Sequence, residues 1–178
     1  MELEEKTLRS SYPFRGKVVT VRVDEVLLPD GKESKREIVE HAGAVAIIPV
    51  NEKQEVLCIR QFRKAAGKVL LEIPAGLVEQ GETLEACAQR ELAEEIGFMS
   101  NKLVKLSSFY PSPGFSSEMI HVYLAQELVK KTVDKPDDEF IALEKFPLKE
   151  GLSKIQSGVV EDGKTIIGLL MALQYPGL

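Results

Sequence analysis

The segment 83–96 combines a helical hydrophobic pattern with glutamates on the side that should be buried, and it restricts the fold more than any other part of the chain. On an ideal helix of about 100° per residue, one apolar stripe contains Leu84, Ala88, Leu92 and Ile96. Glu95 falls between the angular positions of Leu84 and Ala88, inside that stripe. An ordinary surface helix places its glutamates on the opposite side. This helix, with Gly97 in the position of a C-terminal glycine cap, is therefore expected to bring acidic side chains to the edge of a core.

Glu91, Glu94 and Glu95 are spaced i, i+3 and i+4, which directs their carboxylates toward one point. Crowded carboxylates repel one another and resist ionisation unless a cation lies among them. Oxygen ligands suit Mg²⁺, or Mn²⁺, rather than zinc. Arg90 lies one helical turn before Glu94 and can brace the cluster with an ion pair. The pattern alone leaves a second interpretation open, namely a solvated acidic helix face held by salt bridges.

The rest of the chain is typical of a protein rich in strands. Alternating or continuous apolar segments predict strands, and these lie at 18–28, 37–39, 44–50, 56–62, 69–73, 103–110, 120–128 and 140–146. Turn residues at 29–31 and 51–53 indicate hairpins, so that 56–62 is the expected partner of 44–50. Two more helices are expected at 149–156 and 164–174. This order indicates an α+β fold with helices packed on a mixed sheet.

Composition and charge exclude several classes of protein. The 178 residues, 44% apolar and 29% charged, have the composition of a globular domain. The net charge of −5 argues against a nucleic-acid partner held by bulk charge. Cys58 and Cys87 lack CxxC spacing, so neither a disulfide framework nor a zinc site is expected. An acidic N-terminus and a longest apolar run of only 42–50 predict no signal peptide and no membrane span, which favours a cytoplasmic protein.

The residues from Gly76 to Phe98 follow a longer pattern. It consists of glycine, five residues, Glu82, seven residues, and then Arg-Glu-Leu-Ala-Glu-Glu-Ile-Gly-Phe from Arg90 onward. This pattern matches the Nudix box at every position. The chain therefore resembles the Nudix hydrolases, which use Mg²⁺ to cleave a nucleoside diphosphate linked to another group. The resemblance implies an α/β/α sandwich.

The resemblance also implies where the metal binds. Contacts are expected from Glu91, Glu95 and the carbonyl oxygen of Ala75, with Glu94 close by. Gly76 suits a loop whose backbone approaches phosphate, because glycine has no Cβ, although a simple turn glycine would look the same. Metal ions that bridge phosphate oxygens cancel their charge and orient water for in-line attack, which is what hydrolysis of a diphosphate requires.

Segments outside the box resemble the ADP-ribose pyrophosphatase branch of this family. The stretch 72–76 (Glu-Ile-Pro-Ala-Gly) precedes the box, and Pro113 is the fifteenth residue after Phe98. The resemblance implies that Arg36 and Glu37 hold the adenine. It also implies that Arg63 contacts the diphosphate and that Leu77 and Ser112 line the substrate.

These assignments have plainer alternatives. Arg36 and Glu37 could be charges of an edge strand, Arg63 a surface arginine, and Pro113 an ordinary loop proline. The chain has no tryptophan to stack on adenine, so Arg36 or a phenylalanine would have to serve. Base selectivity therefore stays open.

The general base is expected on the acidic, proline-containing segment 134–139, where Glu139 best matches the position that the resemblance implies. A solvated acidic turn is the alternative. The chain is expected to divide into an N-terminal extension, residues 1–41, and a Nudix domain, residues 42–178. Because an isolated hairpin is marginally stable in water, we expect the extension to pack on another surface. Relatives in this branch pair through this region, which predicts a homodimer with a shared substrate clamp.

Together these features predict an enzyme that converts ADP-ribose and water to AMP and ribose 5-phosphate with Mg²⁺. Its partner would be a small nucleoside diphosphate sugar, with neither nucleic acid nor membrane involved. Two alternatives are a hydrolase of another nucleoside diphosphate sugar and a non-catalytic domain that senses ADP-ribose. The complete set of Glu91, Glu94 and Glu95 argues against the sensor, which has no need of all three.

Overall fold

The computed structural model describes residues 3–131, 133 and 140–178. The chain forms two compact units. The N-terminal unit comprises Met1–Gly43 and Tyr110–Met119, and the core unit comprises Ala44–Phe109 and Ile120–Leu178. Segment 110–119 therefore belongs with the N-terminal strands although it lies far from them in the sequence.

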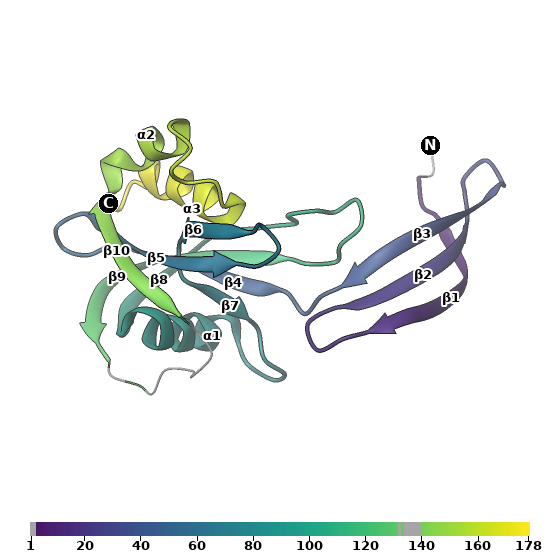
Figure 1. Cartoon of the computed structure of the whole chain (residues 1–178), viewed down its shortest axis with the longest axis horizontal. Helices are drawn as coiled ribbons and strands as arrows, with labels where there is room; N and C mark the ends of the chain where they lie inside the picture. The colour runs from purple at the N-terminus through teal and green to yellow at the C-terminus, as the bar shows by residue number, and fades with distance from the viewer. Residues whose placement is uncertain (1–2, 132, 134–139) are drawn as a thin grey trace. The chain divides into compact units, whose positions relative to one another are not determined.

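The N-terminal unit contains a three-stranded antiparallel sheet in the order β1-β2-β3 (Figure 1). Its strands are β1 Lys6–Arg15, β2 Thr20–Leu27 and β3 Glu33–Glu40. β2 and β3 form the predicted antiparallel hairpin. β1 adds a strand that the sequence did not predict, because its ten residues are all exposed and show no clear alternation. A bridge between Val39 and Ser116 attaches segment 110–119 to β3.

The core unit contains two sheets. One has the order β7-β4-β9-β8, in which β4 and β9 are parallel and the other pairs antiparallel. The other is antiparallel with the order β10-β5-β6. The strands are β4 Ala44–Pro49, β5 Glu55–Arg63, β6 Lys68–Glu72, β7 Ala75–Leu77, β8 Phe98–Phe109, β9 Ile120–Lys130 and β10 Ile141–Pro147. The predicted mixed sheet is confirmed.

The predicted pairing of 44–50 with 56–62 is wrong. β4 and β5 belong to different sheets, and only an isolated bridge between Val50 and Val56 joins the ends of this hairpin-like segment. β4 pairs instead with β7 and β9, and β5 pairs with β6 and β10. A short polar turn favours local pairing, but β4 is buried along its whole length and satisfies its backbone in the centre of its own sheet.

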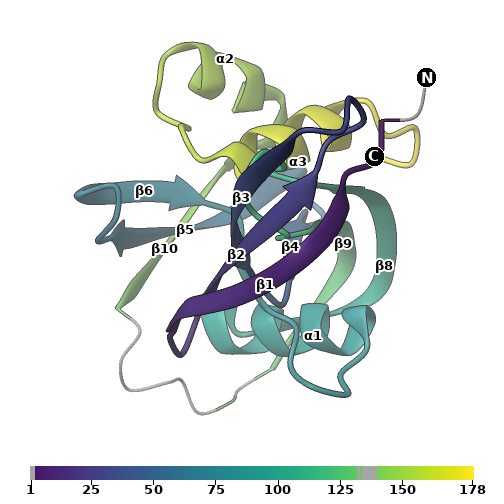
Figure 2. The same cartoon turned by 90° about the vertical axis from the view of Figure 1, so that its right-hand side faces the viewer.

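Helices cover both faces of the strands in the core unit. The helices are α1 Leu84–Glu91, α2 Gly151–Gln156 and α3 Gly163–Leu173, with a 3₁₀ turn, η2 Leu148–Glu150, before α2. Both views place α1 on one side and α2 and α3 on the other (Figures 1 and 2). Successive β4 residues alternate between two apolar cores: Ala46 and Ile48 pack with α3, and Val45 and Ile47 with α1. This is the predicted α/β/α layering.

The helix predicted over 83–96 is present, with a change of geometry near its end. Thr83 caps α1 by accepting a hydrogen bond from the amide of Ala86. α1 ends at Glu91, and the chain continues as a π-helical turn, η1 Leu92–Ile96. Gly97 then ends the helix in the left-handed conformation, with φ of 74°, as a glycine cap does. In the part of the chain that the structure describes, no helix has the length and apolar character needed to cross a membrane.

Candidate active site

The carboxylates of Glu91 and Glu95 lie against two adjacent backbone positions at the start of β7. The amide of Ala75 donates a hydrogen bond of 3.1 Å to Oε2 of Glu95. A Cβ on Gly76 would lie 1.8 Å from Oε1 of Glu91, so any larger residue at this position would displace the Glu91 carboxylate from where it lies. Both glutamates are buried, with 8% and 5% of Glu91 and Glu95 exposed. The helix therefore brings two acidic side chains to the core edge, as its pattern predicted.

The π-helical turn lies within this cluster. Glu91 is the last residue of α1, whereas Glu94 and Glu95 lie in η1. A π turn contains more residues than an α turn and is frequent at functional sites. The angular positions expected from an ideal α-helix are therefore approximate beyond Glu91, but the predicted burial of Glu95 is present.

Arg90 binds the acidic residues around the two buried carboxylates. It donates two hydrogen bonds of 3.0 Å to Glu82 and one of 3.1 Å to Glu94, and it also contacts Oε1 of Glu91. The predicted ion pair between Arg90 and Glu94 is thus present. The hydrogen bonds from Arg90 lower the pKa of Glu82 to about 2, because they favour the charged carboxylate over the acid. A further hydrogen bond to the carbonyl of Leu77 ties Arg90 to β7.

The residues at this site fit a divalent cation with oxygen ligands. Two buried carboxylates adjoin the backbone of Ala75 and Gly76, and the absence of a Cβ at Gly76 lets the Glu91 carboxylate lie against that backbone. Among residues 3–131, 133 and 140–178, no three His, Cys, Asp or Glu side chains gather tightly enough to hold a metal alone. A cation here would therefore need oxygens besides those of Glu91 and Glu95, such as the carbonyl of Ala75, water or a ligand's phosphate.

Arg63 lies at the end of β5 and forms a two-point ion pair with Glu72. Its Nε and Nη2 donate hydrogen bonds of 2.7 and 2.8 Å to the two oxygens of that carboxylate. The hydrogen bond to Glu72 raises the pKa of Arg63, and the charge of Glu95 adds to this rise. Arg63 therefore lies within the electrostatic reach of the buried acidic cluster. Its side chain is 41% exposed.

The remaining predicted residues lie in different places. Leu77 belongs to β7 and is exposed. Ser112 and Pro113 lie in segment 110–119 of the N-terminal unit, where the carbonyl of Ser112 accepts a hydrogen bond from the amide of Ser116. Glu139 lies outside the described residues.

Arg36 and Glu37 occupy adjacent positions of β3 in the N-terminal unit. The guanidinium of Arg36 forms an ion pair with Glu5 and a hydrogen bond to Ser34. Successive side chains of a strand point to opposite faces. The two residues are therefore presented on different faces of the sheet, and a ligand lying flat on one face would meet only one of them directly.

Three polar residues around the cluster had no assigned role in the sequence analysis. Glu82 is a fixed position of the box, and that was the signal for its pairing with Arg90. Glu72 and Lys164 are 92 residues apart in the sequence, yet they form an ion pair beside Arg63. No local pattern connects two positions so distant. The burial of Glu72 has no periodic signal either, because Leu71 and Glu72 are both buried at the end of β6.

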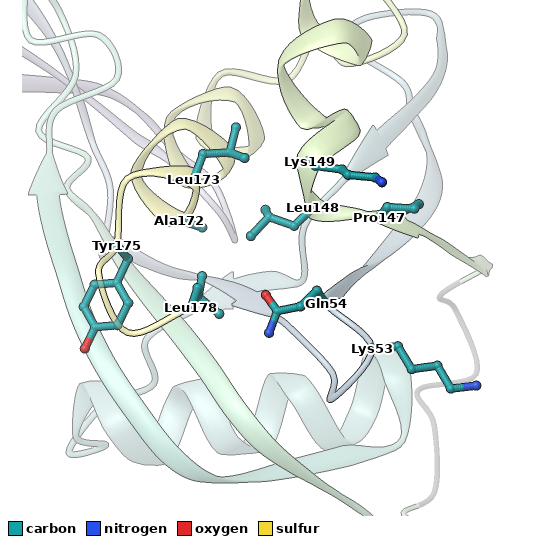
Figure 3. A pocket seen from close by; sticks show the side chains of 9 residues that line it. All are labelled: Lys53, Gln54, Pro147, Leu148, Lys149, Ala172, Leu173, Tyr175 and Leu178. Carbon is teal, nitrogen blue, oxygen red and sulfur yellow. The ribbon is translucent and has the colours of Figure 1, made fainter.

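A cavity of about 480 Å³ lies elsewhere in the core unit (Figure 3). Its lining residues are Lys53, Gln54, Pro147, Leu148, Lys149, Ala172, Leu173, Tyr175 and Leu178. None of the residues predicted for substrate, metal or catalysis belongs to this set. The cavity is therefore separate from the acidic cluster.

Comparisons with known proteins agree with this architecture. Residues 40–166 match the family described as NUDIX domain, and residues 5–39 match the nucleoside diphosphate sugar hydrolase N-terminal domain. The chain is 43% identical to the ADP-ribose pyrophosphatase of Bacillus subtilis (strain 168), over 97% of this chain and 92% of that protein. It is also 43% identical to the methanol dehydrogenase activator of Bacillus methanolicus, again over 97% and 92%. A crystal structure of an ADP compounds hydrolase superposes with a TM-score of 0.88 at 22% identity, covering 98% of this chain and 95% of that one.

Proposed function

Since this chain belongs to the Nudix family, we propose that it hydrolyses the diphosphate of ADP-ribose to AMP and ribose 5-phosphate with Mg²⁺. The observation that carries the proposal is the placement of Glu91 and Glu95, two buried carboxylates packed against Ala75 and Gly76. The identity to an ADP-ribose pyrophosphatase along nearly the whole chain supports this choice of substrate. A small-molecule substrate of this kind also suits the expected cytoplasmic location.

The site residues divide the work of hydrolysis between them. Glu91, Glu95 and the carbonyl of Ala75 would hold the cation. When bound, a divalent cation neutralises phosphate oxygens and lowers the pKa of water. Arg63 would bind the diphosphate through the part of its guanidinium that Glu72 does not occupy. Arg90 holds Glu82 and Glu94 in place around the metal ligands.

Glu139 is our candidate for the base that accepts a proton from the attacking water. A base that acts on water rather than on the bound substrate affects kcat more than KM. Glu139→Gln should therefore lower kcat and leave KM and metal affinity nearly unchanged. If Asp138→Asn has this effect and Glu139→Gln does not, the base is the neighbouring residue. If neither variant changes kcat, the base belongs to the box.

Product analysis in heavy-oxygen water tests the function directly. The protein is incubated with Mg²⁺ and ADP-ribose, ADP-glucose or GDP-mannose, and the products are weighed by mass spectrometry. We expect ADP-ribose to be cleaved fastest, with one heavy oxygen entering either AMP or ribose 5-phosphate. Faster cleavage of another sugar nucleotide would reassign the substrate. Binding of ADP-ribose without cleavage would favour a sensor. Direct measurement matters because a relative of equal identity is named as a methanol dehydrogenase activator.

We further propose that the protein is a homodimer in which residues 1–41 serve both pairing and substrate binding, and residues 42–178 form the hydrolase domain. β1 is exposed along its whole length and carries Leu8, Tyr12 and Phe14, which are 53%, 42% and 54% exposed. An exposed edge strand with apolar side chains favours association with another chain. The match of residues 5–39 to a domain found in sugar-nucleotide hydrolases supports a role in substrate binding.

A further inference from the structure

Glu72 pairs with two cationic side chains, Arg63 and Lys164, and only Arg63 has so far been given a role in substrate binding. Its side chain is 1% exposed, and both of its oxygens accept hydrogen bonds from Arg63. One of these oxygens also accepts a hydrogen bond from Nζ of Lys164, whose side chain is only 12% exposed. A buried carboxylate needs compensating charge. Here the compensation comes from two cations rather than one.

Lys164 is held in place by the first turn of α3. Asp162 caps this helix by accepting hydrogen bonds from the amide and the hydroxyl of Thr165, and it also pairs with Lys164 at 3.1 Å. The hydroxyl of Thr165, which is fully buried, accepts a hydrogen bond from the amide of Ile73. Ile73 directly follows Glu72. The turn thus fixes Lys164 relative to the end of β6.

This arrangement determines which part of the Arg63 guanidinium is available. Nε and Nη2 of Arg63 are directed at Glu72, so the plane of the carboxylate fixes the plane of the guanidinium. Nη1 has no partner among the residues that the structure describes, and Arg63 lies within the electrostatic reach of Glu95. Nη1 is therefore the nitrogen of Arg63 that is left to bind a ligand phosphate.

Lys164 also affects the charge that Arg63 presents. A carboxylate paired with one guanidinium largely cancels its charge. When Glu72 is shared with a second cation, less of the Arg63 charge is neutralised, and the attraction of Arg63 for an anion is stronger. Removing Lys164 would take away one of the two cationic side chains that hold the Glu72 carboxylate, so the carboxylate would be less firmly oriented and would neutralise more of the Arg63 charge.

We propose that Lys164 is a positioning residue that acts through Glu72 to orient the guanidinium of Arg63 for the substrate diphosphate. The proposal rests on the proposed function, in which Arg63 binds that diphosphate. Lys164 itself does not contact the substrate. Its effect is therefore on substrate binding and depends on the presence of Arg63.

A double-mutant cycle tests this dependence. Lys164→Met should raise KM for ADP-ribose by about tenfold, the effect of a lost hydrogen bond to a charged group, with much less change in kcat. The Kd of a methylene-bridged ADP-ribose analogue, which cannot be hydrolysed, should rise by a similar factor. Lys164→Arg should restore both values to near those of the wild type. In an Arg63→Ala background, Lys164→Met should change KM by less than about twofold.

The matched control is Lys68→Met, which removes a lysine from the exposed ion pair with Glu161 in the same unit and should leave KM unchanged. If Lys164→Met does not fold, Lys164→Gln replaces it in the same cycle. An equal rise in KM with and without Arg63 would overturn the proposal and make Lys164 purely structural. An unchanged KM in Lys164→Met, or in Lys164→Gln where that variant replaces it, would also overturn the proposal. Failure of the proposed function is distinct, because the wild-type protein itself would then not cleave ADP-ribose.

Discussion

Glu95 is the residue for which the sequence pattern, the burial and the expected chemistry agree most closely. Its carboxylate is buried and accepts a hydrogen bond from Ala75. Glu95→Gln keeps the shape and this hydrogen bond but removes the charge that a cation needs. We expect kcat to fall by roughly 10³, equivalent to about 4 kcal/mol, while the melting temperature stays the same or rises because a crowded charge is lost.

The control for this substitution is Glu85→Gln on the same helix. Glu85 is exposed and accepts a hydrogen bond from the hydroxyl of Tyr123, outside the cluster. Its substitution should leave kcat within about twofold of the wild type. Near-normal turnover by Glu95→Gln in the same assay would remove this residue from the metal site.

Glu82 should make the stability of the protein depend on pH. Its pKa is lowered to about 2 by Arg90, compared with an ordinary value of 4.5. A pKa that is lower in the folded chain stabilises the fold above the unfolded value, and this contribution is lost as pH falls toward the folded value. Glu82→Gln should therefore destabilise the protein at neutral pH. The difference from the wild type should shrink between pH 4.5 and about 2.

Urea unfolding at a series of pH values measures this difference directly. Glu79→Gln, an exposed neighbour in the same loop, serves as the control because it removes a carboxylate that Arg90 does not contact. A difference between wild type and Glu82→Gln that stays constant down to pH 2 would show that the ion pair with Arg90 does not carry this stability.

The sequence predicted the contacts of individual site residues best where the two partners lie close together along the chain. The spacing of Arg90 and Glu94 predicted their ion pair, and the helical pattern predicted the burial of Glu95. The pairing of Glu72 with Lys164 depends on β6 and α3 meeting in the fold, and no local spacing encodes it.

At the scale of elements, alanine substitutions at two glycines are expected to have opposite effects on activity and stability. A Cβ at Gly76 would lie 1.8 Å from the flexible end of Glu91, which can move away. Gly76→Ala should therefore reduce kcat strongly and stability little. A Cβ at Gly168 in α3 would lie 2.8 Å from Cδ1 of Ile48 and 3.0 Å from Cδ1 of Ile73, inside a packed core. Gly168→Ala should cost about 1–3 kcal/mol of stability and leave kcat of the folded protein nearly unchanged.

Calorimetry and steady-state kinetics on both alanine variants separate these effects. Each variant acts as the control for the other, since both replace glycine by alanine in the core unit. The account of Gly76 would be wrong if Gly76→Ala kept full activity, because Glu91 would then tolerate displacement. It would also be wrong if both variants lost stability and activity in proportion.

Sequence predicted the elements well and their pairing less well. The strands and helices of the core unit lie where hydrophobic periodicity predicted them, except for the short β7 after Pro74 and the start of β8, which begins at Phe98 rather than at residue 103. Periodicity reports which face of a segment is buried but not its neighbour. One of the two partners of β4 is β9, which pairs with it in parallel from far along the chain. The sequence also did not predict the π-helical form of η1, because the residues of η1 fit an α-helical pattern as well.

At the scale of the whole molecule, each active site of the proposed homodimer would be built from residues of both chains. β1 is an exposed edge strand, and the N-terminal unit is a small sheet with few buried apolar residues among those described. A two-fold interface would place equivalent residues of both chains at equivalent sites. Under this proposal, Arg36 of one chain would complete the substrate site built around Glu95 of the other.

Mixing two inactive variants tests this arrangement quantitatively. Arg36→Ala removes the proposed adenine contact and Glu95→Gln removes a metal ligand, so each homodimer should be nearly inactive. Random exchange of equal amounts makes about half of the dimers mixed, and each mixed dimer collects both defects in one site and leaves the other intact. Activity should therefore recover to about a quarter of the wild-type value, measured after exchange has been verified by mass spectrometry of the native dimers. Verified exchange without any recovery would mean that each chain builds its own site from its own Arg36 and Glu95.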